Sequence, residues 1–529
     1  MWLPNTHNLG SNSGRMATQQ QLLDPLCTKH LQTDLKGRAV RGGVFTVSAQ
    51  GTQFLVQSVQ TVVLARLLTP GDFGLVAMVT AVTGLAQGFA DVGLSEATIQ
   101  RQEINHDQVS ALFWINVTVG LALMLATMAL GPVLAWFYRE PRLTYIALLV
   151  SLTFLIGGLR NQPEAILKRQ MQFKLLAIRD ITASALGVAS AVITALLGGG
   201  YWSLVAFPLT ASLTQMTLSW VMVNWKPRLP RRGTKVRSLV AFGGNVALSY
   251  FIYNVNRSAD NVLVGWYWGA GPLGLYSKAL SLLMLPLRQL TAPVNAVVIP
   301  TFSRTQDNPE RFARYYLRAI NLTTWAVAPI FGFLFVAAQP VITLVLGSQW
   351  RSATPVFQIL ATCALAQLIL DSTLWLFVSR GQSARLLKLL LTISPVLIGG
   401  FAIGLPFGIK GVALVGSLTL VGILPWGLKY AFRGTVLNLK RLGHAILCPI
   451  SLGVAGVFMA EVALHVVAPQ HIVAQLIVVG LGFAAAYTLS LLIPAVREQV
   501  MSFRELFGEL RRSKQSAWVE QVPLAYESE

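Results

Sequence analysis

The chain is poor in charged residues, and acidic residues are especially scarce. Only 12% of its 529 residues are charged, whereas 54% are hydrophobic, and 41 Lys and Arg stand against 21 Asp and Glu. A soluble domain carries about 25% charged residues. The deficit excludes an ordinary soluble protein and indicates a chain that places most of its length in lipid.

Residues that perform catalysis or bind metals are also few. Cys27, Cys363 and Cys448 are widely spaced, which excludes a disulfide framework and a cysteine metal site. The 6 histidines are scattered along the chain, so we expect no bound metal. The sequence contains no Gly-Lys dipeptide, and therefore no Walker A loop, and no Asp-x-Asp element. We expect neither an enzyme nor a cofactor.

Long apolar runs are what the sequence has in abundance. They come in blocks of about twenty residues, which as helices would cross the roughly 30 Å hydrocarbon core of a bilayer. The blocks are 42–66, 72–97, 109–137, 143–168, 176–198, 202–225, 239–265, 272–300, 319–347, 355–379, 385–406, 409–431, 443–466 and 471–495. The sequence therefore predicts an all-α integral membrane protein with about fourteen transmembrane helices.

The location of the basic residues explains the net charge of +20. With the N-terminus inside, most Lys and Arg fall in segments on the cytoplasmic side, including 226–238 and 301–318. This distribution follows the positive-inside rule and predicts that both termini are cytoplasmic, in a bacterial inner membrane. We expect the charge to contact anionic membrane lipid and not nucleic acid, because the patches are dispersed and lack a reader motif. The external segments hold only Arg66, Arg139, Arg142, Arg351 and Lys410.

The connection 301–318 is predicted to contain a helix that lies at the membrane interface. Phe312 and Tyr316 fall on one helical face, and Arg311 and Arg314 fall on another. Such a division of apolar and basic residues is typical of interfacial helices.

A weak internal repeat organises the chain. Gly71-Asp72-Phe73-Gly74-Leu75 corresponds to Gly271-Pro272-Leu273-Gly274-Leu275 at an offset of 200 residues. An offset that spans six helices returns the chain to the same side, so the halves are parallel repeats. We predict two parallel six-helix bundles plus two C-terminal helices. The expected parts are a polar cytoplasmic leader (1–38), an N-terminal bundle (39–225), a basic cytoplasmic linker (226–238), a C-terminal bundle (239–431), two additional helices (432–496) and a cytoplasmic tail (497–529).

Polar side chains inside spans are costly and therefore mark candidate functional positions. Two sets share one face of the first helix of each half, at matching repeat positions. Facing stripes would line a central substrate path, which we favour, although interhelical hydrogen bonding is the alternative. The two sets are Gln50, Gln53, Gln57 and Gln60, and Tyr250, Tyr253, Arg257 and Asp260.

Positive charge is expected on the same path. Arg257 and Asp260 are three residues apart and can pair along a helix. Lys278 and Arg288 on the following helix would give the cavity excess positive charge, which suits a diphosphate. Lys278 could instead extend to the outer interface.

A second charged set is expected at the inner ends of the spans. Arg160, Glu164 and Lys168 follow one another at four-residue steps, which predicts a ladder of ion pairs. We interpret this set mainly as a cytoplasmic latch, and the alternative is a carboxylate that couples transport to protons. The other candidates for this gate or coupling site are Asp91, Glu96 and Asp371, the last of which shares a helix face with Gln367.

Five stretches resemble a known family, the Wzx/WzxC-like bacterial polysaccharide flippases. These belong to the polysaccharide transporter branch of the multidrug/oligosaccharidyl-lipid/polysaccharide (MOP) exporter superfamily. The similarity covers about 40–430, and departs from the family where Gly71 replaces an often acidic residue and Trp266 an often basic one. The stretches are 64–75 (LARLLTPGDFGL), 89–97 (FADVGLSEA), 163–169 (PEAILKR), 259–265 (ADNVLVG) and 273–279 (LGLYSKA).

The resemblance implies two bundles in a V around a central cavity. It implies alternating-access translocation of undecaprenyl-diphosphate-linked oligosaccharide repeat units, for exopolysaccharide, capsule or lipopolysaccharide biosynthesis. The expected partners are this prenyl-diphosphate-linked oligosaccharide, membrane lipid, and the polymerase and chain-length regulator of the pathway. Two alternatives stay open. A cation-coupled small-molecule exporter would need acidic cavity residues, and a membrane glycosyltransferase or polymerase would need larger loops with acidic residues.

Overall fold

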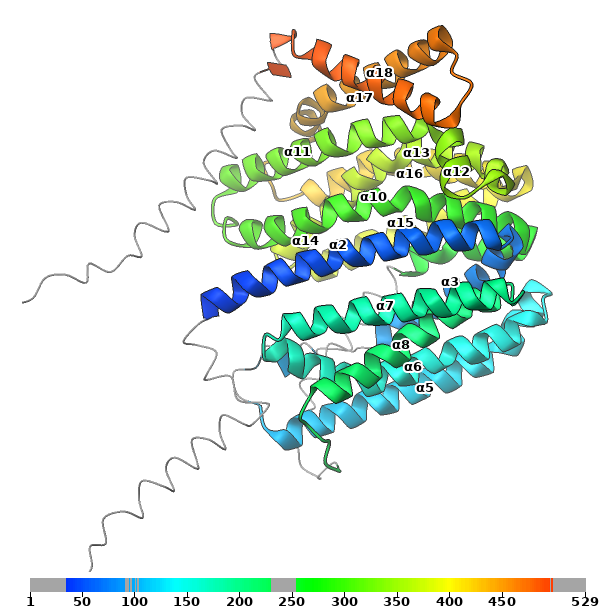
Figure 1. The fold of residues 1–529 in the computed structure, drawn as a ribbon. Coiled ribbons are helices and arrows are strands. Elements are labelled where there is room, and N and C mark those ends of the chain that lie inside the picture. Colours follow the sequence, from blue (N-terminus) through cyan, green and yellow to red (C-terminus); the bar gives the residue numbers. More distant parts are fainter. Residues whose placement is uncertain are drawn as a thin grey trace, which may run out of the picture. The chain divides into compact units, whose positions relative to one another are not determined.

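The computed structural model describes residues 35–90, 95, 98–99, 101, 104–229, 254–494 and 496–497, and the regular structure in them is helical (Figure 1). The earlier helices are α2 (Leu35–Leu67), α3 (Pro70–Ala90), α5 (His106–Tyr138), α6 (Arg142–Arg169), α7 (Phe173–Leu196), α8 (Trp202–Met222), a helix over 254–268, and α10 (Ala270–Ser303). The later helices are α11 (Pro309–Val336), α12 (Ala338–Val345), η2 (Ser348–Ala353), α13 (Thr354–Asp371), α14 (Thr373–Ser379), α15 (Ser383–Gly404), η3 (Leu405–Phe407), α16 (Gly408–Phe432), α17 (Leu439–Val467) and α18 (Ile472–Ser490).

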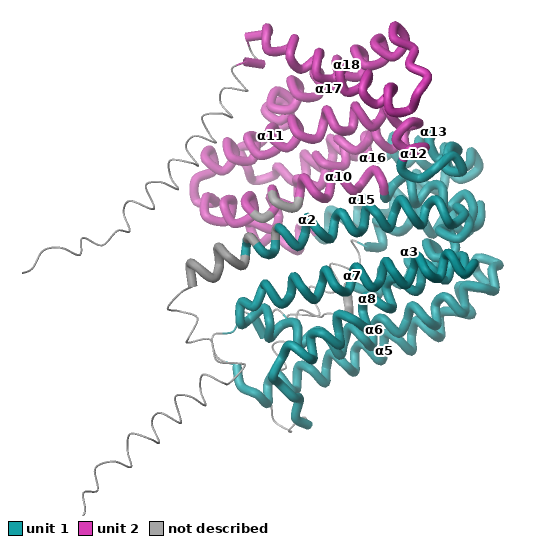
Figure 2. The backbone as a smooth tube through the Cα atoms, viewed as in Figure 1, with its two compact units in different colours: residues 1–281, 345–356, 387–419 teal, residues 282–344, 357–386, 420–529 magenta. Residues whose placement is uncertain are grey.

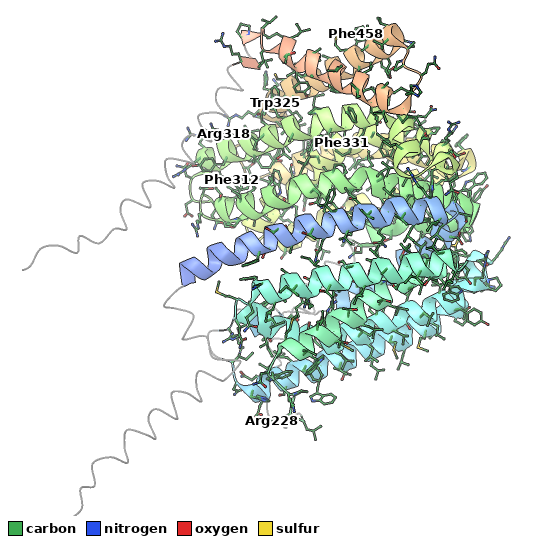
Figure 3. All side chains as sticks on the ribbon, in the orientation of Figure 1. Arg228, Phe312, Arg318, Trp325, Phe331 and Phe458 are labelled. Atoms are coloured by element: carbon green, nitrogen blue, oxygen red, sulfur yellow. The ribbon has the colours of Figure 1, made fainter. Side chains whose placement is uncertain are left out.

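The all-α membrane class predicted from the sequence is confirmed. Within the described residues, 9 segments are long and apolar enough to cross a membrane, and one of them, Ser383–Phe432, contains both α15 and α16. Large apolar side chains such as Phe458 of α17 stand exposed on the helices, as lipid-facing residues do (Figure 3). Each expected apolar block overlaps a helix, and the total of about fourteen stays a prediction.

The expected interfacial helix over 301–318 is wrong as a separate element. α10 continues to Ser303, and α11 begins at Pro309 and runs without interruption to Val336. The Asn308 side chain accepts a hydrogen bond from the Arg311 N–H at 3.0 Å, and Pro309 occupies the first helical position. Both features start a helix, and nothing in the following residues ends it before the span.

The predicted faces of this segment are confirmed. Phe312 and Tyr316 are buried, whereas Arg311 and Arg314 are exposed. The amphipathic pattern thus belongs to the first turns of a membrane-spanning helix. The pattern alone cannot distinguish the two cases, because both place apolar residues on one face and basic residues at the membrane surface.

The chain forms two compact units, which Figure 2 shows in different colours. In unit 1, α5 packs on α6, α7 on α8 and on α2, and α6 on α8. In unit 2, α11 and α18 both pack on α17. The bundle boundaries expected from the sequence stay predictions. Unit 1 comprises residues 1–281, 345–356 and 387–419, and unit 2 comprises residues 282–344, 357–386 and 420–529.

The first turns of α3 and α10 cross closely within unit 1. A β-carbon on Gly74 would overlap the carbonyl group of Ala270, and a β-carbon on Gly274 would overlap the carbonyl of Pro70. These four positions form two pairs at the offset of 200 residues. The contact is therefore reciprocal, as in a two-fold interface. Positions that correspond in the predicted repeat meet one another here, and only glycine permits the close approach.

Candidate functional site

A polar cavity of about 360 Å³ lies within unit 1, between α3, α6 and α8. This volume falls in the range of small-molecule sites. Charged and amide side chains line a cavity that sits among membrane-spanning helices, where such groups are costly and mark function. The polar lining includes Gln87, Arg160, Asn161, Glu164, Lys168 and Ser212.

One face of α6 carries the ladder predicted from the sequence. Arg160, Glu164 and Lys168 lie one turn apart, because 3.6 residues complete a turn. Arg160 Nε lies 3.4 Å from Glu164 Oε2, and Lys168 Nζ lies 2.9 Å from Glu164 Oε1. Both predicted ion pairs are therefore present, and a single carboxylate serves two cations.

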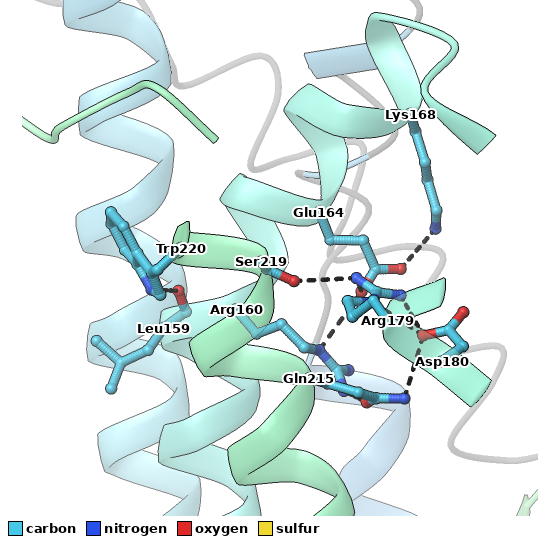
Figure 4. Close-up of polar contacts among 9 residues, drawn as sticks. All are labelled: Leu159, Arg160, Glu164, Lys168, Arg179, Asp180, Gln215, Ser219 and Trp220. Carbon is cyan, nitrogen blue, oxygen red and sulfur yellow. Dashed lines mark hydrogen bonds and ion pairs between the residues drawn. The ribbon is translucent and has the colours of Figure 1, made fainter. Parts of the chain in front are cut away.

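A proline inside the ladder frees a backbone carbonyl. Pro163 has no N–H to donate to the carbonyl of Leu159, four residues earlier. The indole Nε1 of Trp220 on α8 donates to that oxygen instead, at 3.1 Å (Figure 4). The proline thus creates a polar link between α6 and α8 at the level of the cavity.

Arg179 of α7 belongs to the same network but does not line the cavity. Its side chain is only 4% exposed, and its guanidinium lies 3.0 Å from Glu164 Oε2 and 2.7 Å from Asp180 Oδ1. It also donates to Ser219 Oγ at 3.1 Å. A buried guanidinium is tolerated only with such paired and hydrogen-bonded surroundings.

Gln215 of α8 closes the network. Its side-chain oxygen accepts a hydrogen bond from Arg160, and its Nε2 lies 3.4 Å from Asp180 Oδ1 (Figure 4). Three helices are thus held by three cations, Arg160, Lys168 and Arg179, and two carboxylates. Among the described residues, the cavity wall carries Arg160 and Lys168 against the single carboxylate of Glu164, so one positive charge is in excess and favours an anionic ligand.

Sequence reasoning missed part of this site, namely Arg179, Asp180 and Gln215. A signal was present, because Arg179-Asp180 is a charged dipeptide inside the apolar block 176–198. Buried charges of this kind need a partner on another helix. The sequence does not say which helix supplies it.

The four glutamines of α2 are exposed or half-buried. Within the part of the chain that the structure describes, the side-chain amides of Gln50, Gln53, Gln57 and Gln60 make no hydrogen bond to a residue of another helix. Contact with a substrate path stays a prediction.

The second stripe is described only in part. Tyr250 and Tyr253 lie outside the described residues, whereas Arg257 is exposed and Asp260 is buried. Asp260 accepts a hydrogen bond from the hydroxyl of Tyr276 at 3.0 Å. The carboxylate is therefore held by α10, and its predicted pairing with Arg257 stays a prediction.

Lys278 and Arg288, the other cations expected on the path, lie in different units. The ammonium of Lys278 sits 4.5 Å from the centre of the Phe73 ring, which is a cation–π contact. This contact fixes Lys278 against α3 within unit 1. Arg288 is exposed on α10 in unit 2.

The remaining gate candidates are divided. Asp91 and Glu96 lie outside the described residues. Gln367 donates to Asp371 Oδ1 at 2.9 Å, so the two share a face of α13 as predicted. Among the described residues, no group of three His, Cys, Asp or Glu is arranged to hold a metal ion, and Cys363 and Cys448 form no disulfide.

The fold resembles solved membrane transporters. A structure titled "Lipid II flippase MurJ, inward closed conformation" matches with a TM-score of 0.67, over 85% of this chain and 98% of that one, at 14% identity. An inward-facing multidrug resistance MATE transporter of the MOP superfamily matches with a TM-score of 0.58, over 72% and 95% of the two chains, at 15% identity. The class defined by this fold is the multi-pass helical membrane protein, with the fold that these two structures share.

Residues 63–355, more than half of the chain, match the family model described as "Polysaccharide biosynthesis protein". The chain belongs to this family, which confirms the resemblance found in the sequence. Among its relatives is the succinoglycan biosynthesis transport protein ExoT of Rhizobium meliloti, 28% identical over 60% of this chain and 64% of that protein. The match thus spans less than two thirds of ExoT. Another relative is the lipopolysaccharide biosynthesis protein WzxC of Escherichia coli, 23% identical over 73% of this chain and 80% of that protein.

Proposed function

We propose that the protein is a flippase for prenyl-diphosphate-linked oligosaccharide repeat units in the bacterial inner membrane. The observation that carries the proposal is the cavity beside α6, which places an excess of positive charge inside a bundle of membrane helices. Membership of the polysaccharide biosynthesis family and the names of ExoT and MurJ support it. The product would serve exopolysaccharide, capsule or lipopolysaccharide synthesis.

A polar cavity inside a helical bundle would allow the polar part of such a substrate to cross the hydrocarbon core. An oligosaccharide and a diphosphate lose many hydrogen bonds on entering hydrocarbon, which costs several kcal/mol for each unsatisfied group. A cavity lined by guanidinium, ammonium and amide groups replaces those bonds. The prenyl tail needs no cavity, because it is as apolar as the lipid around it. Alternating access would then carry the polar part past the membrane midplane.

The sidedness of the cavity follows from the topology that we propose. Basic residues dominate the segments that lie inside if the N-terminus is cytoplasmic. α6 then runs inward, and Lys168, in its last turn, lies near the cytoplasmic surface. The cavity would therefore open to newly made repeat units. A polymerase and a chain-length regulator would act on the product on the other side.

Deletion of the gene in its natural host tests this function. We expect lipid-linked repeat units to accumulate on the cytoplasmic leaflet and extracellular polysaccharide to be lost, with both restored by the wild-type gene. Normal polysaccharide and no accumulation would overturn the proposal. Increased sensitivity to small organic cations in place of this defect would favour a drug exporter.

A further inference from the structure

We propose that the α6 cavity is a seat for a phosphate-type anion and that Glu164 occupies this seat as an internal substitute for the ligand. The inference rests on the proposed function, in which the anion is the diphosphate between lipid and sugar. In this proposal the carboxylate of Glu164 competes with the ligand. Arg160 and Lys168 are the cations that bind the ligand, and Arg179 is a structural cation.

Glu164 has more cationic partners than one carboxylate needs. Lys168, Arg179 and Arg160 lie 2.9, 3.0 and 3.4 Å from its oxygens. Its side chain is 19% exposed, so it borders the cavity and is not sealed in the protein. A group of cations gathered around one anionic centre is the arrangement that proteins use to bind phosphate.

The three cations are not equivalent. Arg179 keeps a second carboxylate, because its Nη2 and Nε lie 2.7 and 2.8 Å from Asp180 Oδ1, and it also donates a hydrogen bond to Ser219. It does not line the cavity, and departure of Glu164 would leave it paired. Arg179 is therefore the structural cation.

Arg160 and Lys168 do line the cavity, and their side chains are 26% and 44% exposed. Neither lies within ion-pair distance of a second carboxylate among the described residues. Their α-carbons are separated by about 12 Å along the helix axis, a span that two long side chains can close around a diphosphate. Asn161 and Gln87 add amide donors at the same wall.

Replacement of Glu164 by the ligand at Arg160 and Lys168 would also change a contact between helices. The Glu164–Arg179 pair joins α6 to α7, and α7 packs on α2, which carries the glutamine stripe. An anion that takes over Arg160 and Lys168 leaves Arg179 as the last ion-pair partner of Glu164, so the link between α6 and α7 then depends on this one pair. The seat thus connects occupancy to the packing of α7, as a two-state transporter requires.

Binding of farnesyl diphosphate to the purified full-length protein tests the proposal. We expect wild-type protein to bind it, Glu164→Gln to bind about tenfold more tightly, and Lys168→Met about tenfold more weakly, because hydrogen bonds to charged groups contribute about 1.5–3 kcal/mol. The matched control is Glu310→Gln, which removes a carboxylate from the exposed pair with Arg441 and should leave binding unchanged. Affinity is measured by isothermal titration calorimetry, and thermal unfolding verifies each variant.

Two results overturn the proposal. One is a folded Glu164→Gln protein that binds no more tightly than wild type. The other is unchanged binding by a folded Lys168→Met protein. The Lys168 side chain is 44% exposed, so this variant tests the proposal even where Glu164→Gln does not fold.

Competition identifies the source of the phosphate chemistry. Inorganic pyrophosphate should displace farnesyl diphosphate, and farnesol should not. Displacement by phosphatidylglycerol vesicles but not by pyrophosphate would assign the seat to a lipid headgroup and overturn the diphosphate assignment. If these assays fail while the deletion strain still accumulates lipid-linked repeat units, only this inference is wrong and the flippase function stands.

Discussion

A buried network of charges joins helices in unit 1, whereas a cluster of neutral hydrogen bonds and aromatic rings joins helices in unit 2. In unit 2 the buried hydroxyls of Tyr316 and Ser372 lie 2.7 Å apart, and the Trp375 indole donates to Asn295 Oδ1 at 2.6 Å. The Phe302 ring packs against both Tyr316 and Trp375. In unit 1 the corresponding role is taken by the Glu164–Arg179 network.

The difference distinguishes a ligand-binding site, the charge network of unit 1, from a structural scaffold, the neutral contacts of unit 2. Neutral pairs make few demands on their surroundings and gain little from an ionic ligand, so they suit a fixed helix contact. A buried charge network is costly to assemble and is strongly disturbed when one member leaves. An ion pair that a ligand can replace therefore belongs where the structure has to respond. The exposed pair Arg441–Glu310 of unit 2 contributes little, because solvent screens it.

The largest expected effect comes from breaking the unit 1 network at its structural cation. Arg179→Met leaves Glu164 and Asp180 without their buried partner and should lower the free energy of unfolding by about 3–5 kcal/mol. Thermal unfolding in detergent measures it. Arg314→Met, at an exposed position of α11, is the control. Equal shifts for the two variants would contradict a charge-based interior in unit 1.

The glycine crossing should respond next most strongly. Gly74→Val forces a side chain against the backbone of α10 and should cost about 1–3 kcal/mol or more. Gly84→Val on the same helix meets nothing within 4 Å and serves as the control. Folded yield and unfolding temperature are the measurements. Gly274→Val should match Gly74→Val, and a large inequality between them would argue against the reciprocal contact of the repeats.

Removal of a neutral hydrogen bond in unit 2 should lower the stability less and should leave ligand binding unchanged. Tyr316→Phe removes one hydroxyl, while Ser372 retains its hydrogen bond to the carbonyl of Ile369 at 2.6 Å. We expect a loss of about 1 kcal/mol in unfolding free energy. Farnesyl diphosphate affinity should stay at the wild-type value. Weakened binding in a folded Tyr316→Phe protein would remove the distinction between site and scaffold.

The smallest effect on stability is expected from Glu140→Gln, in the connection between α5 and α6. Two hydrogen bonds from Arg142 to Glu140, at 2.7 and 3.0 Å, hold the pKa of that carboxyl below its usual range. Because the folded-state pKa is lowered, the stabilisation is present above the unfolded pKa of about 4.3 and is lost as pH falls. The stability difference between wild type and Glu140→Gln should therefore shrink below about pH 4. A constant difference from pH 7 to pH 3 would contradict it.

Features that depend on residues close in the chain were predictable. The apolar blocks give the spans, and the four-residue steps give the pairs Arg160–Glu164 and Glu164–Lys168. The contact of Gln367 with Asp371 follows in the same way. Helix geometry alone fixes which residues share a face, so spacing is enough to predict them.

Features that join different helices were not predictable. The cation–π contact of Lys278 with Phe73 joins α10 to α3, and the expected place of Lys278 on a substrate path stays a prediction. The segment 301–318 was expected to lie on the membrane, and most of it forms the end of α10 and the start of α11. In both cases one pattern permits several environments, and packing chooses among them.

The sequence by itself determined that this is a helical membrane protein of the polysaccharide biosynthesis family. The lengths of the apolar runs, the positions of the basic residues and the family motifs can all be recognised without knowing which helices pack together. Only the tertiary structure decided that Arg179, Asp180 and Gln215 complete the ladder of α6. A buried charge requires a partner, and the identity of that partner depends on which helix faces come into contact.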